Sequence, residues 1–336
     1  MDTKVLRQKV LDLAIRGKLV PQDPNDEPAS VLLERIRQQK QQMVKDGKLK
    51  AKDIKNDTII FVSEDNLHYE KFADGSVKCI EDEIPFELPD GWAWSRLGAV
   101  AEAIGDGDHQ PPPQTSFGVP FLVISNVSGG RLSFENTRFV SKEYFSQLPE
   151  TRKPRNGDLL FTVTGSYGIP VLIDSDDKFC FQRHIAIVRP CTISNRYLYV
   201  ILGSSYVKSI CDAKATGTAQ KTVGLATLRE LLIPVAPYKE QMQIYAQTQD
   251  ALSIVDSVSS DKEDLLNIIE SAKTKILDLA IRGQLVPQDP TDEPASVLLE
   301  RIRAEKEELI KQGKIKRDKK ESVIFRGEDN SYYLKT

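Results

Sequence analysis

A block of 27 residues that occurs twice constrains this chain more than any other feature. Residues 11–37 read LDLAIRGKLVPQDPNDEPASVLLERIR, and residues 277–303 repeat them with two changes. The changes are Lys18 to Gln284 and Asn25 to Thr291. Two copies this far apart exclude a solenoid, in which neighbouring repeats must stack on one another. The chain therefore carries two related segments around an unrelated middle segment.

Weaker similarity continues beyond the block. VKDGKLK (44–50) matches IKQGKIK (310–316), and IFVSEDNLHY (60–69) matches IFRGEDNSYY (324–333). Charged positions repeat as faithfully as apolar ones, although a packed core requires only apolar residues of suitable size. Two explanations stay open: both copies dock on the same kind of partner surface, or the duplication is recent.

Composition indicates a soluble protein of two or three domains. The chain has 336 residues, of which 40% are hydrophobic and 28% charged. No apolar run approaches the roughly 18 residues that span a bilayer, and the first residues lack the apolar core of a signal peptide. We therefore expect a cytoplasmic protein without a membrane partner. A net charge of −3 argues against a general nucleic-acid coat protein, so any DNA-binding face must come from local arrangement.

The strongest helical pattern precedes the second copy. From Ala251 to Leu279, apolar residues recur at alternating steps of four and three, which is the heptad spacing of a coiled coil. The seam residues offered to a partner helix are Val255, Val258, Leu265, Ile269, Ile276 and Leu279. Without a breaker after Pro237, the helix is predicted to run from Lys239 to Arg282, with Gly283 as its stop. Its length would be roughly 60–65 Å.

Shorter elements surround this helix. A second helix is predicted from Glu27 to Asp46, and a hairpin with Asp74-Gly75 at its turn follows. Within 85–238, short apolar runs such as VPFLVIS, GDLLFTVTG, IPVLID and IAIVRP alternate with Gly, Pro, Asn and Asp. The stretch NRYLYVILGSSYVKSICDA is predicted to form a helix. The middle segment is therefore expected to be an α+β domain.

Several fragments together resemble a known family. They are LDLAIRGKLVPQ, IPFELPDGWAWSRLG, GDGDHQPP, VPFLVISNV, NGDLLFTVTGSYG and LLIPVAPYKEQ. Their order and spacing are similar to those of the specificity subunit of type I restriction–modification systems. Members usually carry two target-recognition domains, each reading one half of a split DNA site, joined by helical regions that repeat within the chain.

The resemblance implies a domain organisation. Residues 85–238 would be a mixed α/β target-recognition domain, flanked by helical conserved regions at 1–84 and 239–336 that form a long antiparallel coiled coil. This chain holds one recognition domain, so it resembles a half-length subunit or a chain cut after the repeat. Two chains pairing their long helices would restore the twofold symmetry of the family as a homodimer. The helix length then limits the half-site separation to on the order of 18 base pairs.

Four polar loops of the middle segment are candidates for DNA contact, because base edges require donors and acceptors. GDGDHQPP offers Asp108, His109 and Gln110, and TGSYG offers Thr164, Ser166 and Tyr167. FQRHIAI offers Gln182, Arg183 and His184, and ATGTAQKTVG offers Thr216, Gly217, Thr218, Gln220 and Lys221. The last loop is similar to a Gly-Thr loop of the family. It is the preferred candidate.

Roles for these side chains follow from their chemistry. Lys221 suits a phosphate, and Gln220 suits a base or a sugar. Gln182 can pair with adenine and Arg183 with guanine. The alternatives are structural: His109 braces its loop, TGSYG is an ordinary hairpin turn, and Arg183 is a surface ion-pair partner.

Catalysis finds little support in the sequence. There is no Gly-rich loop after a leading strand and no Asn/Asp-Pro-Pro-Tyr/Phe element, so the chain is not expected to bind a cofactor. S-adenosylmethionine, ATP and Mg²⁺ belong, by the resemblance, to partner subunits. The four cysteines and three histidines lack metal-ligand spacing, so neither a metal site nor catalytic residues are predicted.

The sequence thus favours a non-catalytic DNA-specificity subunit. Its partners would be double-stranded DNA and methyltransferase subunits, and through them a restriction subunit. One alternative is an interaction protein that occupies methyltransferase subunits without reading DNA. Another is a stand-alone hydrolase built around His109 and His184.

Overall fold

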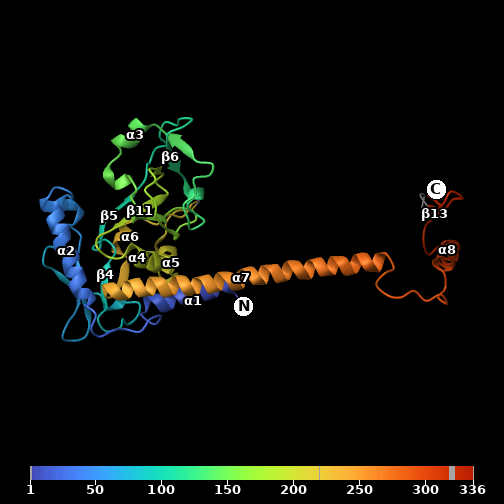
Figure 1. Ribbon diagram of the computed structural model, residues 1–336, viewed down its shortest axis with the longest axis horizontal. Coiled ribbons are helices and arrows are strands. Elements are labelled where there is room, and N and C mark those ends of the chain that lie inside the picture. Colours follow the sequence, from blue (N-terminus) through green and yellow to red (C-terminus); the bar gives the residue numbers. More distant parts are fainter. Residues whose placement is uncertain (1, 219, 318–321, 336) are drawn as a thin grey trace. The chain divides into compact units, whose positions relative to one another are not determined.

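The computed structural model describes residues 2–218, 220–317 and 322–335 (Figure 1). The chain divides into two compact units, Met1–Lys262 and Glu263–Thr336. One long helix, α7, passes through the division between them. No helix of the described ranges is long and apolar enough to cross a membrane.

The first unit contains most of the regular structure. Its α-helices are α1 (Thr3–Ile15), α2 (Ala29–Lys45), α3 (Lys142–Gln147), α4 (Asn195–Leu202), α5 (Ser205–Lys214), α6 (Leu225–Glu230) and the first part of α7 (Tyr238–Ile281). Its strands are β1 (Ile59–Val62), β2 (His68–Lys71), β3 (Val77–Cys79), β4 (Ala93–Arg96), β5 (Ala101–Asp106), β6 (Val119–Leu122), β7 (Arg138–Val140), β8 (Leu159–Thr162), β9 (Pro170–Leu172), β10 (Cys180–Phe181), β11 (Ile185–Pro190) and β12 (Leu232–Val235). The second unit contains α8 (Ala295–Lys311), β13 (Val323–Arg326) and β14 (Tyr332–Lys335).

A four-stranded sheet in the order β5-β11-β8-β9 forms the centre of the middle domain, and all of its neighbouring strands are antiparallel. Strand β11 reads IAIVRP and is buried along almost its whole length, which explains its uninterrupted apolar sequence. Its one charged residue, Arg189, is buried and pairs with Asp158 at 2.7 Å. A buried charge requires such a partner.

Smaller sheets complete the domain. Strands β10, β6 and β7 form a three-stranded sheet in which β10 and β6 are parallel, and β12 pairs with β4. Helices α4, α5 and α6 lie between the four-stranded sheet and α7 (Figure 1). The middle segment is therefore the α+β domain that the sequence predicted.

The first copy of the repeat packs against the middle domain and shares its main hydrophobic core. Ala14, Ile15 and Leu32 are fully buried in the same cluster as Val188 of β11. The core therefore extends across residue 84, where the sequence placed a domain boundary. Residues 1–84 and 85–238 fold as parts of one compact unit.

Polar contacts fix this packing at two places. Glu240, at the start of α7, accepts from the indole of Trp92 at 2.9 Å and from the amide of Gln22 at 3.2 Å. The ammonium group of Lys40, buried on α2, donates to the backbone carbonyl of Gly98 at 2.9 Å. These contacts are directional, so they set the register of the repeat on the domain.

Helix α1 runs antiparallel to the first part of α7. Thr3 contacts Ser259 through a hydroxyl pair at 3.4 Å, and Arg7 forms an ion pair with Asp256. Sequence numbers thus rise along one helix as they fall along the other (Figure 1). This antiparallel pair lies within one chain, whereas the predicted coiled coil joins two long helices.

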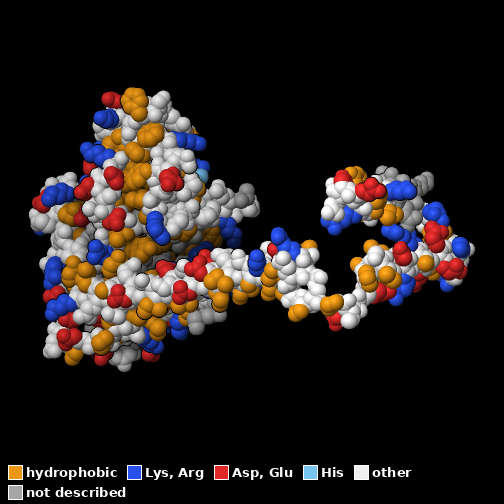
Figure 2. Space-filling model, turned by 45° about the vertical axis from the view of Figure 1, so that its right-hand side comes forward, with side chains coloured by type: hydrophobic (Ala, Val, Ile, Leu, Met, Phe, Trp, Pro, Cys, Tyr) orange, Lys and Arg blue, Asp and Glu red, His pale blue; other side chains and the backbone are white. Residues whose placement is uncertain are grey.

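The long helix itself was predicted closely, since α7 covers Tyr238–Ile281. One seam residue requires correction: Val255 is only 8% exposed and is buried inside the first unit, so it is not available to a partner helix. Val258 is 39% exposed, and the later seam residues Leu265, Ile269 and Ile276 are more exposed still. Orange side chains along the bare stretch of α7 are visible in Figure 2. Leu279 is half-buried.

Two further predictions can be compared with the structure. The hairpin turn at Asp74-Gly75 is confirmed, with Gly75 at a positive φ of 88°. The stretch after Ser194 was wrongly taken as one helix. It breaks into α4 and α5 at Gly203, because the hydroxyl of Ser204 accepts from the amide of Val207 and starts a new helix.

The buried carboxyl of Glu240 predicts a measurable pH dependence. Burial raises its pKa above the ordinary 4.5, and hydrogen bonds from Gln22 and Trp92 offset this only in part. The folded chain therefore binds this proton more tightly than the unfolded chain, and folding loses stability as the pH rises past 4.5. Glu240→Gln keeps an acceptor for Trp92 but does not titrate. Its free energy of unfolding, measured by urea titration, should therefore increase relative to that of the parent as the pH rises from 4.5 to about 7.

Glu240→Ala is the matched control. It leaves the Trp92 indole without an acceptor and should lower the free energy of unfolding by about 1–3 kcal/mol at either pH. Equal pH profiles for the parent and the Gln variant would contradict the assignment.

Candidate functional site

The four loops singled out from the sequence lie at one end of the four-stranded sheet. Strand β11 pairs antiparallel with both neighbours, so its start lies beside the ends of β5 and β8. Ala186 is opposite Asp106 on one side, and Ile185 is opposite Thr162 on the other. The loops that follow β5 and β8 and the loop that precedes β11 therefore emerge at the same edge.

The loop after β5 and the loop before β11 are joined by their backbones. Asp108 forms an isolated parallel bridge with Gln182. The amide of Asp108 donates to the carbonyl of Phe181 at 2.9 Å, and the amide of Arg183 donates to the carbonyl of Asp108 at 3.0 Å. Gly107 permits this approach, because a Cβ there would lie 1.9 Å from the carbonyl oxygen of Phe181.

The other two loops continue the same surface. The amide of Val163 donates to the carbonyl of His184 at 2.9 Å, and the amide of Gly165 donates to the carbonyl of Lys221 at 3.0 Å. Thr222 bridges both Thr164 and Thr216. Stretches as distant in sequence as 108 and 221 thus form one continuous polar surface.

The predicted side chains differ in accessibility on this surface. The exposed ones are His109, Gln110, Ser166, Arg183, Thr216, Gly217, Thr218, Gln220 and Lys221. Tyr167, Gln182 and His184 are half-buried, and Asp108 and Thr164 are buried. The loop from 215 to 222 is therefore exposed over most of its described length, as expected of a contact loop.

Asp108 and its neighbours brace the first loop. Asp108 is 8% exposed and lies 3.2 Å from the guanidinium of Arg152, and His109 pairs with Asp106 at 2.8 Å. The structure thus realises the bracing alternative for His109, whose ring nevertheless remains 57% exposed. Sequence patterns did not identify Arg152 as a partner, because 44 residues separate it from Asp108.

Positive charge at the surface comes from two side chains. Neither Arg183 nor Lys221 forms an ion pair with another residue of the described ranges, which removes the ion-pair alternative for Arg183 within this chain. Burial, and next the charge of Arg183, lowers the pKa of His184, so its imidazole is neutral near pH 7. Arg183 and Lys221 can therefore meet an anion, while His184 offers a neutral donor or acceptor.

Tyr167 is turned away from the shared surface toward α5. Its hydroxyl donates to Asp212 at 2.8 Å, and the ammonium of Lys208 lies 4.0 Å from its ring centre. A cavity of about 490 Å³ beside it is lined by Gln8 of α1 and by 165–169. Tyr167 is thus held by α5 in the chain alone.

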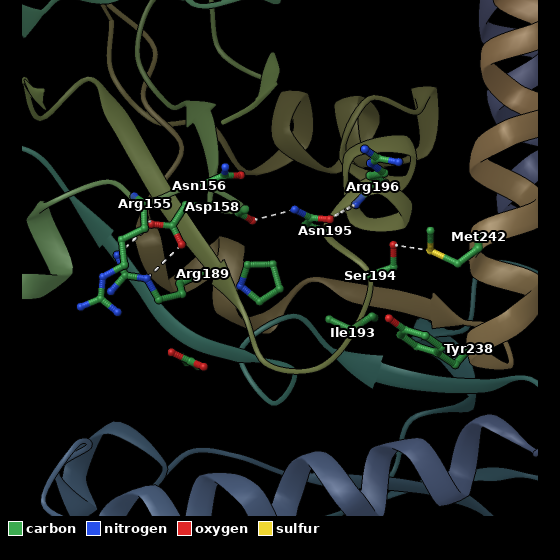
Figure 3. A pocket seen from close by; sticks show the side chains of 13 residues that line it. Arg155, Asn156, Asp158, Arg189, Ile193, Ser194, Asn195, Arg196, Tyr238 and Met242 are labelled. Atoms are coloured by element: carbon green, nitrogen blue, oxygen red, sulfur yellow. Dashed lines mark hydrogen bonds and ion pairs between the residues drawn. The ribbon is translucent and has the colours of Figure 1, made fainter. Parts of the chain in front are cut away.

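A second cavity, of about 430 Å³, lies at the opposite end of the sheet (Figure 3). Three of its polar side chains are engaged within the chain. Arg189 pairs with Asp158, the amide of Asn195 donates to the carbonyl of Gly157 at 3.1 Å, and Ser194 contacts the sulfur of Met242 at 3.5 Å (Figure 3). This cavity therefore provides structural contacts, and none of the predicted site residues lines it.

A hydrolase built on His109 and His184 gains no support from the geometry. No hydrogen bond among the described residues joins the two rings. Over the same ranges, no three His, Cys, Asp or Glu side chains are grouped so that they could hold a metal ion. The surface has the chemistry of binding: one guanidinium, one ammonium, amides, hydroxyls and a neutral imidazole.

Comparison with known proteins places this surface within a described family. Residues 89–267 match the type I restriction modification DNA specificity domain. The EcoAI specificity subunit of Escherichia coli is 32% identical over 94% of this chain and 58% of its own length. The EcoEI specificity subunit of the same species is 30% identical over 94% of this chain and 57% of its own length.

This chain thus spans little more than half the length of these relatives. Among solved structures, the HsdS subunit from Thermoanaerobacter tengcongensis is 24% identical, with a TM-score of 0.44 over 60% of this chain and 47% of that chain.

Gly107 provides a test of how the surface is assembled. In Gly107→Ala the added methyl meets the carbonyl of Phe181, so the loops must separate. We expect the free energy of unfolding to fall by about 1–3 kcal/mol and the amide of Arg183 to lose protection from hydrogen exchange. In the control Gly129→Ala nothing lies within 4 Å, and stability should change by less than about 0.5 kcal/mol. Retained Arg183 protection in Gly107→Ala would refute this assembly.

Proposed function

The chain belongs to the type I restriction–modification DNA specificity family, and from this premise we propose that it reads a sequence in double-stranded DNA for methyltransferase subunits. One observation carries the proposal: four loops distant in sequence share one edge of the sheet, and together they expose Arg183, Gln220 and Lys221. A contiguous polar surface with unpaired positive charge suits a nucleic acid, where phosphates set register and base edges set specificity.

We assign the two kinds of contact to different side chains. Lys221 is exposed in a loop rich in Gly and Thr, and it would contact a phosphate. Gln182 and Arg183 lie in the short connection between β10 and β11, and they would read base edges. Backbone hydrogen bonds to Asp108 hold this connection, and a side chain on a backbone held in this way is better positioned than one on a free loop, which favours the reading role for these two.

The methyl chemistry belongs, in this proposal, to the partner. The chain acts without a catalytic residue or cofactor of its own and works in the cytoplasm. Methyltransferase subunits would supply S-adenosylmethionine and extrude the target base. A restriction subunit, with ATP and Mg²⁺, would join through the methyltransferase subunits.

As a symmetric dimer, a chain with a single recognition domain could recognise a split DNA target. Val258 is exposed at the end of the contact with α1, and the exposed apolar residues Leu265 and Ile269 follow it along α7, which leaves a stripe for a second helix. Two chains pairing these stripes form an isologous contact that closes as a dimer. The two recognition surfaces would then be identical, so the DNA motif would be an interrupted palindrome.

Substitutions on the surface separate the two contact types. Lys221→Ala should weaken binding to all duplexes and reduce the slope of log K against log salt by about 1. Arg183→Ala should cost about 1–3 kcal/mol on the target and relax preference at one base pair. Fluorescence anisotropy at several salt concentrations measures both.

Lys178→Ala is the matched control, because Lys178 is an exposed lysine outside the four loops, in the segment between β9 and β10. It should change neither the affinity nor the salt slope. If Lys178→Ala and Lys221→Ala had equal effects, DNA would have to bind at a surface other than the one formed by the four loops.

The target itself can be read by mapping N6-methyladenine in DNA from cells that express the chain with its cognate methyltransferase, against a deletion of the chain. We expect a split palindromic motif that appears only with the chain. A split but asymmetric motif would indicate that the chain pairs with a different subunit and not with a second copy of itself. An unchanged methylation pattern would favour an interaction protein that holds methyltransferase subunits without reading DNA.

A further inference from the structure

Asp212 lies in the last turn of α5, next to two of the four loops of the candidate site. Its side chain is 51% exposed. It accepts from Tyr167 of the loop after β8, and α5 leads directly into the loop from 215 to 222. Asp212 therefore stands at the margin of the polar surface, on the side of α5 to which Tyr167 turns.

The two polar contacts of Asp212 use the same carboxylate oxygen. The hydroxyl of Tyr167 donates to Oδ1 at 2.8 Å, and the ammonium group of Lys208 donates to Oδ1 at 2.6 Å. Within the described residues, no hydrogen bond engages Oδ2. The carboxylate therefore retains one acceptor atom for a molecule outside the chain.

The side chains that hold Asp212 are themselves fixed. The ammonium of Lys208 lies 4.0 Å from the ring centre of Tyr167, so the three side chains contact one another. The loop that carries Tyr167 is tied by the amide of Gly165 to the carbonyl of Lys221. A side chain already held by two donors loses little further freedom when it binds a ligand. Oδ2 is therefore an acceptor whose position is set before anything binds.

The stability of α5 does not explain an acidic residue at this position. A negative charge in the last turn of a helix is unfavourable, because the helix dipole places partial negative charge there. Lys208 precedes Asp212 by four residues, which is the less favourable order for an ion pair on a helix, and the pair is about half exposed. A neutral asparagine would accept from Tyr167 without this unfavourable charge.

Asp212 is ionised at neutral pH. Hydrogen bonds from Lys208 and from Tyr167 lower its pKa below the ordinary 3.8, and the charge of Lys221 acts in the same direction. An ionised carboxylate can only accept hydrogen bonds. Whatever meets Oδ2 must therefore be a donor.

The charge of Asp212 restricts which part of a duplex can face it. Phosphates repel a carboxylate, and so do the N7 and O6 acceptors of guanine in the major groove. The amino groups at N4 of cytosine and N6 of adenine are donors on the same edge. Lys208, Lys214 and Lys221 are exposed along this stretch, so the phosphates on either side of such a base are still attracted.

We propose that Asp212 is a specificity-determining residue, whose Oδ2 accepts a hydrogen bond from the amino group of a cytosine or adenine in the major groove. This rests on the proposed function, which supplies the double-stranded DNA. Tyr167 and Lys208 are positioning residues in this arrangement, because they hold Oδ1 and contact no base. Tyr167 thus acts through Asp212, and the direct DNA contact predicted for it from the sequence is not needed.

Asp212→Asn tests the role of Oδ2 with little other change. The amide oxygen can still accept from Tyr167 and Lys208, whereas the second atom becomes an NH2 group, which donates. The full chain, in complex with its cognate methyltransferase subunits, is incubated with duplexes randomised at each target position in turn, and the bound fraction is sequenced.

The expected result is a change of preference at one base position. The wild-type complex should prefer cytosine or adenine there, and the base found tells the two apart. In Asp212→Asn this preference should fall about tenfold or more, in favour of guanine or thymine, which present acceptors. Preferences at the other positions should be unchanged.

Tyr167→Phe tests positioning separately. It removes one donor to Oδ1 and keeps the ring beside Lys208. We expect the same base to be preferred at the position that Asp212→Asn alters, but with discrimination reduced several-fold at that position alone. If Tyr167 only stabilised the fold, affinity for all duplexes would fall equally.

Asp177→Asn is the matched control. Asp177 is an exposed aspartate in the segment between β9 and β10, so the variant removes the same charge outside the four loops. It should leave the base preference unchanged at every position. A change of preference in Asp177→Asn equal to that in Asp212→Asn would assign the effect to net charge and overturn the proposal.

Other outcomes would overturn the proposal as well. One is an Asp212→Asn complex that keeps the wild-type preference at every position. Another is a loss of preference spread evenly over all positions, which is the result of a structural role alone. Failure of the proposed function is distinguishable, because the wild-type complex would then show no base preference at any position.

Discussion

The pairing of β11 with strands on both of its sides is the constraint on which the rest of the molecule depends. Because β11 is central and antiparallel to both neighbours, the three residues before it are held between the loop after β5 and the loop after β8. Its apolar side chains join the two main clusters of the core, and its far end is fixed by the buried pair of Arg189 and Asp158. A polar surface made of short loops is thereby attached to a buried inner strand of the sheet, and a site supported by such an element is held more precisely than one on loops alone.

The first copy of the repeat is fixed on the middle domain by directional polar contacts. Lys40 of α2 donates to the carbonyl of Gly98, and Glu240 accepts from Trp92 and Gln22. Because these partners lie on different elements, the contacts define how the repeat packs on the domain, while its apolar side chains join the main hydrophobic core.

Periodic features were predictable from the sequence, and positions set by distant partners were not. The bounds of α7, the second helix and the Asp74-Gly75 turn follow from local spacing and from residues with special backbone freedom. The break between α4 and α5 was missed, because a serine cap competes with helix continuation only when both helices can pack. The burial of Val255 was also missed. Heptad spacing indicates that a residue packs against another helix, but it does not show that this helix is α1 of the same chain.

By itself, the sequence determined the kind of domain, the two copies of the repeat, the long helix and the polar loops that could contact DNA. Hydrophobic period, Gly and Pro placement and residue chemistry are local properties, and they can be read along the chain. Only the tertiary structure decided that 108, 164, 183 and 221 lie together at one end of the sheet, that Arg152 braces Asp108 and that Tyr167 turns to α5. Those relations arise from strand order in a sheet, which couples residues more than 100 positions apart and leaves no local trace in the sequence.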